Sequence, residues 1–347
     1  MLVDGPPEQR ADTAPAPSTR RAVRAVGLVV SLVVLTLVAL ASIRTGAKAL
    51  SLDQVWHGLF HDSGTYGDVV VDERLSRTVL GLLAGAALGL SGAVLQALTR
   101  NPLADPGLLG INAGASAAVV TAITCFGVTS LRGYVWFAFA GAAAAGALVW
   151  LLGGSRGATP VRLALAGTAV SAALYGYLQA VMIMDDTALG RMRFWTVGSL
   201  ASATDSTILQ VLPFLAVGTV LALGLARPLN AMAMGDDTAR ALGAGLNRTR
   251  ALAMLAATVL CGAATAACGP IVFVGLMVPH AVRSFTGPDL RWILPYATVL
   301  SPVLLLGADV VGRIVVRPSE LQVGIVTAIL GGPVFILLVR RRRTAQL

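Results

Sequence analysis

The sequence has few charged residues, a single lysine and three cysteines, and each shortage excludes a class of protein. Charged residues make up 12% of its 347 residues, roughly half the share of a typical soluble domain. A P-loop needs G-x-x-x-x-G-K-[ST], but Lys48 is followed by Ala49, so the chain supplies no ATPase of that type. Cys125, Cys261 and Cys268 match no zinc or redox spacing, and we interpret them as small apolar packing residues.

Ionisable side chains are also scarce within the apolar stretches. Asp309 is the acidic residue nearest the interior of such a stretch, and Arg313, four residues on, can pair with it on one helix face. A transporter driven by an ion gradient is expected to carry more such groups, so this class is the less favoured alternative. His57 and His61 have a spacing that can bind a metal on a helix, but without a third ligand we interpret them as an exposed helix face, and we predict neither a metal site nor an enzyme.

Long apolar stretches dominate the rest of the chain, in which 56% of residues are hydrophobic. A helix needs roughly 20 apolar residues to cross a bilayer. The sequence therefore predicts an all-α, polytopic membrane protein with about ten transmembrane helices. They cover approximately residues 24–43, 78–98, 107–126, 134–152, 161–184, 207–226, 250–268, 271–285, 292–312 and 321–339.

The polar ends and loops predict how the chain is oriented. Residues 1–23 are rich in Pro, Ala, Arg and acids, and predict a disordered tail before a transmembrane domain over residues 24–340 and a basic tail over residues 341–347. With the N-terminus inside and alternating spans, 17 of the 26 Lys and Arg residues lie on the inner side. The positive-inside rule then predicts a multi-pass protein of the cell (plasma or inner) membrane with both termini in the cytoplasm.

Four polar segments interrupt the apolar background, at residues 74–77, 96–107, 234–250 and 268–283. In the first, Arg74 and Arg77 share a face at the predicted start of a span, and the residues alone favour anchoring at the membrane interface over a specific role. In the second, Asp105 is placed to cap the following helix. The third predicts a short amphipathic helix, and the fourth breaks a helix at membrane depth.

These segments together resemble the FecCD family of permease subunits. The resemblance rests on GAVLQALTRNPLADPGLLG at Gly92–Gly110, the ARALG loop at Ala239–Gly243, GPIVFVGLMVPHAVR at Gly269–Arg283 and ELQVGIVTAILGGPVF at Glu320–Phe335. It implies a type II ABC importer permease fold, working as a dimer on two cytoplasmic ATP-binding subunits and receiving cargo from an extracytoplasmic binding protein. It implies a transport subunit without catalytic residues or cofactor.

The resemblance also implies roles for individual residues. Arg74, Arg77 and Arg313 correspond to outer arginines that meet acidic residues of the binding protein. The segment at about residues 235–246 corresponds to a coupling helix that rests on the ATPase, with a predicted apolar contact through Ala239, Leu242 and Leu246. The other members of the coupling helix are Asp236, Asp237, Arg240 and Gly243. A weaker correspondence assigns the pathway or gate to Asn101, Leu103, Thr159, Gly167, Thr168, Ser171 and Gln179.

The cargo is not fixed by these residues. An iron–siderophore complex is the favoured cargo, with haem or cobalamin as the alternative, because the family carries all three and specificity lies largely in the binding protein. Whether two copies of this chain or this chain and a paralogue form the dimer is also open.

Overall fold

The computed structural model describes residues 17–46, 49–60, 66–128, 130–154, 159–241, 243 and 245–344, and these residues contain helices and no strand. The elements are α1 (Pro17–Arg44), α2 (Leu52–Phe60), α3 (Tyr66–Thr99), η1 (Pro106–Leu109), α4 (Ile111–Phe126), α5 (Leu131–Gly153), α6 (Pro160–Met184), α7 (Asp186–Trp195), α8 (Asp205–Gly224), α9 (Ala226–Ala233), α10 (Asp236–Ala241), α11 (Leu246–Cys268), α12 (Val274–Thr286), α13 (Leu290–Val315) and α14 (Val323–Thr344).

Each of the ten predicted spans coincides with a helix, although they differ in length. Seven helices in the described part of the chain are long and apolar enough to cross a membrane, namely α1, α3, α5, α6, α8, α11 and α13. α4 and α14 contribute shorter apolar segments of 10–17 residues. The predicted span at residues 271–285 is the 13-residue α12, which is too short to cross ~30 Å of hydrocarbon alone.

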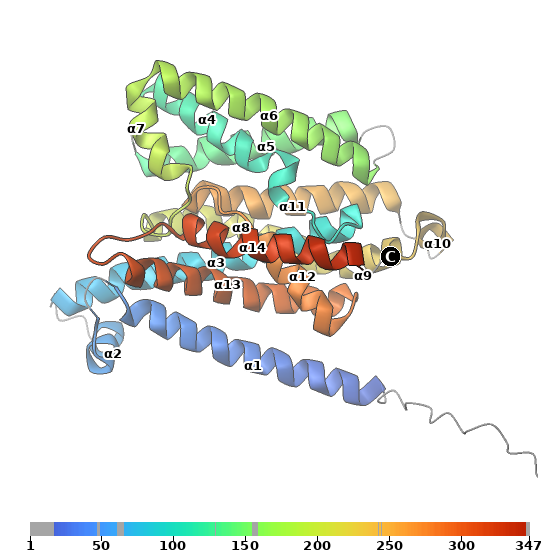
Figure 1. Cartoon of the computed structure of the whole chain (residues 1–347), viewed down its shortest axis with the longest axis horizontal. Coiled ribbons are helices and arrows are strands. Elements are labelled where there is room, and N and C mark those ends of the chain that lie inside the picture. Colours follow the sequence, from blue (N-terminus) through green and yellow to red (C-terminus); the bar gives the residue numbers. More distant parts are fainter. Residues whose placement is uncertain are drawn as a thin grey trace, which may run out of the picture.

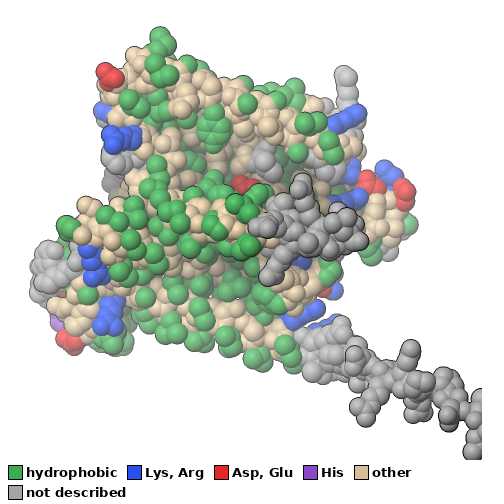
Figure 2. Space-filling model, viewed as in Figure 1, with side chains coloured by type: hydrophobic (Ala, Val, Ile, Leu, Met, Phe, Trp, Pro, Cys, Tyr) green, Lys and Arg blue, Asp and Glu red, His purple; other side chains and the backbone are tan. Residues whose placement is uncertain are grey.

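The helices form a bundle in which α1 flanks one side and α4, α5 and α6 the other (Figure 1). The start of α1 and the C-terminal end of α14 lie at the same end of the bundle, as an even number of crossings requires. Figure 2 shows hydrophobic side chains over the middle of the visible face, with Lys and Arg gathered at its two ends. This distribution matches an apolar membrane interior between two polar interfaces.

Close helix contacts build the core around α3. In the most apolar 18-residue window of α3, 78% of residues are buried. A Cβ atom on Gly92 of α3 would overlap the backbone carbonyl of Gly275 in α12, so the two helices approach to backbone contact. Small residues allow such packing in lipid, where helix association cannot rely on the hydrophobic effect.

Polar side chains add hydrogen bonds between the buried helices. The Gln96 side-chain amide in α3 donates to the backbone oxygen of Leu276 at 3.0 Å. The Asn112 side-chain oxygen in α4 accepts from the Thr265 hydroxyl in α11 at 2.9 Å. Cys261 lies in the same buried cluster, 3.7 Å from the Asn112 oxygen. The predicted packing role therefore holds for Cys261 and Cys268, which are buried, whereas Cys125 is exposed.

Two predicted boundaries were wrong at their N-terminal ends. α1 begins at Pro17, so residues 17–23 are helical rather than part of a disordered tail. α3 begins at Tyr66 rather than near residue 78. The additional turns of α3 pack against α2 and its flanks, where Val71, Val55, Leu50 and Ile43 form a small apolar cluster separate from the main core. Local hydropathy does not reveal this packing, because these turns also carry Asp72, Glu73 and Arg74.

Candidate functional site

A cluster of arginines and carboxylates joins the N-terminal part of α3 to the C-terminal part of α13. The Arg77 guanidinium donates to both carboxylate oxygens of Asp309, at 3.0 and 2.7 Å. It also donates to Glu320 at 2.7 Å. A two-pronged Arg–carboxylate contact fixes both partners, so α3 and α13 are held together at this end. The Arg77 side chain is 12% exposed, and two carboxylates already engage it.

Arg313 belongs to the same cluster but is more buried than a residue that docks a partner protein should be. Its side chain is 1% exposed and pairs with the fully buried Asp309 at 2.9 Å. It also donates to the backbone oxygens of Ser42 and Thr45, at 2.8 and 2.6 Å. The predicted Asp309–Arg313 pair is confirmed, but a binding protein cannot reach Arg313 in this structure, because the guanidinium fastens the end of α1 to α13.

Arg74 and Arg77 are both half-buried, unlike the buried Arg313. The Arg74 guanidinium donates to the backbone oxygens of Ile43 and Arg44, each at 3.0 Å. Because α3 begins at Tyr66, Arg74 lies two turns inside the helix and not at its start. The predicted position of Arg74 at the start of the helix is therefore wrong, and Asp68 occupies the first turn, where an acidic side chain is favoured by the helix dipole.

A cavity of about 800 Å³ lies against α6, between this helix and α14. Its walls include Tyr175, Gln179, Ser116 and Thr196, together with apolar residues of α14. On α6, Thr168, Ser171, Tyr175 and Gln179 follow one another at spacings of three or four residues and share a helix face. Of the predicted pathway residues, Gln179 lines the cavity. The sequence prediction missed Tyr175, although its position four residues after Ser171 and four before Gln179 indicates that it shares their helix face.

The other predicted pathway residues have structural contacts of their own. Thr159 caps the start of α6, where its hydroxyl accepts from the Arg162 backbone N–H at 3.3 Å. The Asn101 side chain accepts from the Leu103 backbone N–H at 3.0 Å in the turn after α3. Gly167 is buried in the chain, and Thr168 is exposed. Asp105 caps η1 by accepting from the Gly107 N–H at 2.8 Å, as predicted, and thereby directs the chain into α4.

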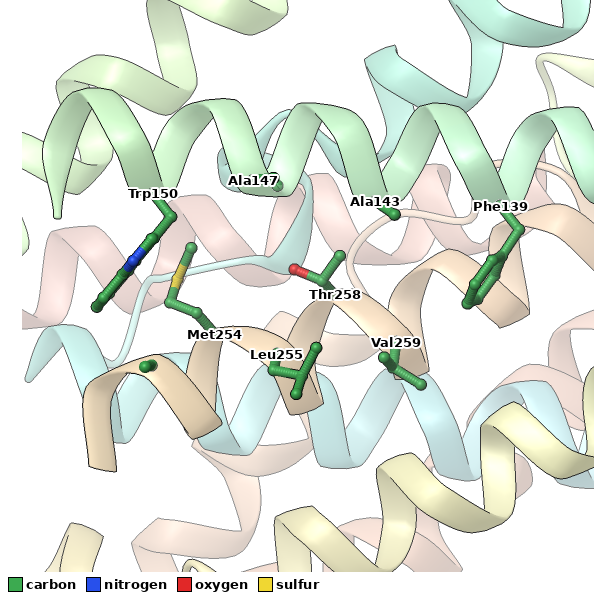
Figure 3. Close-up of a pocket in the computed structure, with 10 residues that line it drawn as sticks. Phe139, Ala143, Ala147, Trp150, Met254, Leu255, Thr258 and Val259 are labelled. Carbon is green, nitrogen blue, oxygen red and sulfur yellow. The ribbon is translucent and has the colours of Figure 1, made fainter. Parts of the chain in front are cut away.

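A second hollow, between α5 and α11, differs from the first in its chemistry (Figure 3). It has a volume of about 380 Å³, and its lining is apolar except for the hydroxyl group of Thr258. Figure 3 shows Phe139, Trp150, Met254 and Leu255 arranged along it. Such a lining suits hydrocarbon rather than a hydrophilic cargo.

The predicted coupling segment forms the short helix α10, which lies at the end of the bundle opposite α2 (Figure 1). Asp236, at its start, accepts from Arg250 at the base of α11 at 2.7 Å and also pairs with Arg100 at the end of α3. Gly243, with φ of +78°, follows the helix. One carboxylate therefore connects α10 to two of the most buried helices, a contact that no local sequence pattern indicates.

Two of the residues predicted to form the apolar contact face of this segment are buried within the chain. Ala239 is fully buried and Leu246 is 6% exposed, so both pack within the chain rather than offering a surface to a partner. Leu242 lies outside the described residues. The side chains of Asp237 and Arg240 are 99% and 64% exposed. Ala239 packs where α9 and α11 contact α10, and Leu246 lies in the first turn of α11, so the coupling role of this segment stays a prediction.

Comparison with known proteins identifies this arrangement. Residues 33–341 match the family model described as the FecCD transport family. The chain belongs to the FecCD transport family. It is 45% identical to the ferric enterobactin transport system permease protein FepD of Escherichia coli (strain K12), over 93% of this chain and 96% of that protein. It is 37% identical to the hemin transport system permease protein HmuU of Yersinia pestis, over 90% and 94%.

A solved structure of another protein has the same fold as this FecCD chain. That structure, described as an inward-facing conformation of a metal-chelate type ABC transporter, superposes with a TM-score of 0.79 at 28% identity, covering 90% of this chain and 98% of the other. The predicted family and the all-α ABC importer permease fold are therefore confirmed. The chain is a multi-pass membrane permease, and its role is transport.

Proposed function

We propose that this FecCD chain is the membrane subunit through which an ATP-driven importer carries an iron–siderophore complex into the cell. The observation that carries the proposal is the 45% identity to a ferric enterobactin permease over nearly the full length of both chains. Haem is the alternative cargo, favoured by the similarity to a hemin permease. Cobalamin is the remaining alternative from the sequence.

The partly polar cavity beside α6 is the proposed portion of the pathway. In the most apolar window of α6 only 22% of residues are buried, and Tyr175 and Gln179 are exposed there. A long apolar helix with a polar stripe suits an interface where a second permease subunit closes a passage. We propose that a second copy or a paralogue provides that wall, with Thr168, Ser171, Tyr175 and Gln179 facing the cargo.

The remaining parts of the importer are separate subunits in this proposal. With both termini in the cytoplasm, α10 meets one of two ATP-binding subunits, and its exposed Asp237 and Arg240 provide the contact. The carboxylate of Asp236 then transmits movement of α10 to α3 and α11, because it holds Arg100 and Arg250 together. On the outer side, Arg74 and the exposed Arg317 meet the carboxylates of a binding protein, while Arg77 and Arg313 support the outer end from within.

The proposal is tested by reconstituting the permease in liposomes with its ATPase and binding protein. Uptake of a ferric siderophore that requires ATP and all three components is the expected result. Uptake of haem instead would reassign the cargo. Cargo uptake by the chain alone, driven by a proton or sodium gradient without ATP, would contradict the importer mechanism.

The pathway assignment has its own test within the same assay. Gln179→Leu should reduce the rate of cargo uptake several-fold, because it removes a hydrogen-bonding group from the proposed passage. Thr258→Val, which removes a polar group from the apolar hollow of Figure 3, is the matched control and should leave uptake unchanged. Equal uptake by the two variants would remove Gln179 from the pathway.

The docking assignment is tested by charge reversal. Arg74→Glu combined with Arg317→Glu should abolish stimulation of the ATPase by loaded binding protein, because opposed carboxylates repel across an interface. Reversing the matching acidic residues of the binding protein should restore stimulation. Full stimulation of the doubly reversed permease by the unmodified binding protein would exclude this docking surface.

A further inference from the structure

A basic pocket lies between the starts of α1 and α13, away from the cavity beside α6. It has a volume of about 580 Å³ and is lined by Arg21, Arg24, Leu28, Asp289, Arg291, Trp292 and Pro295. Three arginines face one aspartate, so the lining carries an excess of positive charge. The starts of α1 and α13 lie at the end of the bundle that holds α10 (Figure 1).

The one carboxylate in the lining is already engaged by its neighbours. Asp289 accepts from the Arg291 guanidinium at 2.9 Å and from the Asn230 side-chain amide at 2.6 Å. The Arg291 hydrogen bonds hold the pKa of Asp289 below its ordinary value, so it stays ionised at neutral pH and remains paired with Arg291. Within the described part of the chain, no carboxylate forms an ion pair with Arg21 or Arg24.

Arg24 is held in position by α13. The Tyr296 hydroxyl in α13 donates to the backbone oxygen of Arg24 at 2.6 Å, which fixes this turn of α1. The Arg24 guanidinium lies 5.9 Å from the centre of the Trp292 ring, within the range of a cation–π contact. Tryptophan is enriched at the level of lipid headgroups, because its ring is apolar and its N–H is polar. These contacts present a cation at the depth where lipid phosphates lie.

The surface that continues from the pocket is apolar. In the most apolar window of α1 only 17% of residues are buried. Val23, Val26, Val30 and Leu37 are more than half exposed along the helix. If the pocket held the anionic group of a ligand, a hydrocarbon chain of that ligand could therefore lie along α1 without burying polar groups.

We propose that this pocket binds the phosphate of an anionic phospholipid, with the acyl chains lying along α1. Basic pockets between membrane helices recognise anionic headgroups in this way, and the adjoining apolar face of α1 favours a lipid over a free phosphate ion. The inference depends on the orientation in the proposed function only to name the leaflet, which is then the cytoplasmic one.

The test measures lipid binding by the purified full-length chain in detergent, with native mass spectrometry as the readout. Dioleoyl phosphatidylglycerol should be retained in preference to dioleoyl phosphatidylcholine. Arg21→Gln with Arg24→Gln should lower the affinity for phosphatidylglycerol roughly tenfold or more, since each basic residue near a membrane surface contributes severalfold to binding of anionic lipid. Arg21→Gln alone, at an exposed position, should show a smaller loss in the same direction if the double variant does not fold.

A matched control separates the pocket from general charge. Arg162 and Arg248 are exposed in the first turns of α6 and α11, and both of these helices start at the end of the bundle that holds α10 (Figure 1). Arg162→Gln with Arg248→Gln removes the same charge. Equal phosphatidylglycerol retention by the two double variants, with both thermally as stable as the unmodified chain, would overturn the proposal. Displacement of the lipid by millimolar inorganic phosphate would also overturn it, because the site would then be one for a free anion. The readout needs no cargo, ATPase or binding protein, so it is independent of whether the proposed transport is correct.

Discussion

The helices α3 and α6 are both long and apolar, yet the chain buries them very differently. In the most apolar windows, 78% of residues are buried in α3 and 22% in α6. α3 packs through backbone contact at Gly92 and through the hydrogen bonds of Gln96, whereas α6 exposes a stripe of polar and aromatic side chains. Hydropathy identifies both as membrane helices, but only packing separates a helix that holds the bundle together from one whose surface is available to a partner.

The largest effect on this contrast is expected where α3 contacts Asp309 of α13 through Arg77. Asp309→Asn should lower the free energy of unfolding by about 3–5 kcal/mol, because it removes the counter-charge that Arg313 and Arg77 share, and leaves Arg77 with Glu320 alone. Glu320→Gln removes a carboxylate from the same Arg77, but Glu320 is 36% exposed and should contribute no more than about 1 kcal/mol. Unfolding of the purified chain in mixed micelles by sodium dodecyl sulfate measures both. Losses of similar size would show that the cluster is solvated and not part of the buried framework.

The glycines of the two helices give a second, smaller test. Gly92→Ala should destabilise the chain by about 1–3 kcal/mol, because its new methyl group would overlap the backbone of α12. Gly176→Ala in α6 meets nothing within 4 Å and should be neutral, or stabilising by up to ~1 kcal/mol through helix propensity. The same unfolding assay on the isolated chain compares them. A destabilising Gly176→Ala would mean that α6 is packed in the monomer after all.

The C-terminal end of α3, where Arg100 pairs with Asp236, gives the smallest expected effect and a pH dependence. Burial alone would raise the pKa of Asp236, but hydrogen bonds from Arg250 and Arg100 outweigh it and hold the pKa below its ordinary value of 3.8. A depressed carboxyl pKa adds stability that is present above the unfolded-state pKa and is lost as the pH falls through the folded one.

Because the Asp236 side chain is 34% exposed, Asp236→Asn should cost no more than about 1 kcal/mol at pH 7. The difference in melting temperature between the variant and the unmodified chain should shrink between pH 5 and pH 3, a window that follows from the linkage. A difference that stays constant over that range would show that the carboxylate charge contributes nothing there.

Much of this architecture could be predicted from the sequence, and the failures have a common cause. The positions of the spans, the Asp105 cap and the Asp309–Arg313 pair depend on neighbours within a few residues, and the sequence predicted them. The burial of Arg313 depends on Ser42, 271 residues away, and the burial of Ala239 depends on how α9 and α11 fold over α10. Tyr175 could have been predicted from the i, i+4 spacing on α6, because its neighbours along that face are polar.

The length of α3 has a mechanical consequence. Its 34 residues form one uninterrupted rod of about 50 Å, longer than the hydrocarbon core is thick. Arg100, directly after its C-terminal end, pairs with Asp236 at the start of α10. Arg77, about three turns from its N-terminal end, pairs with Asp309 of α13. If α10 meets an ATP-binding subunit as proposed, a movement of α10 would reach Asp309 of α13 through this one helix, which is continuous from Arg77 to Thr99.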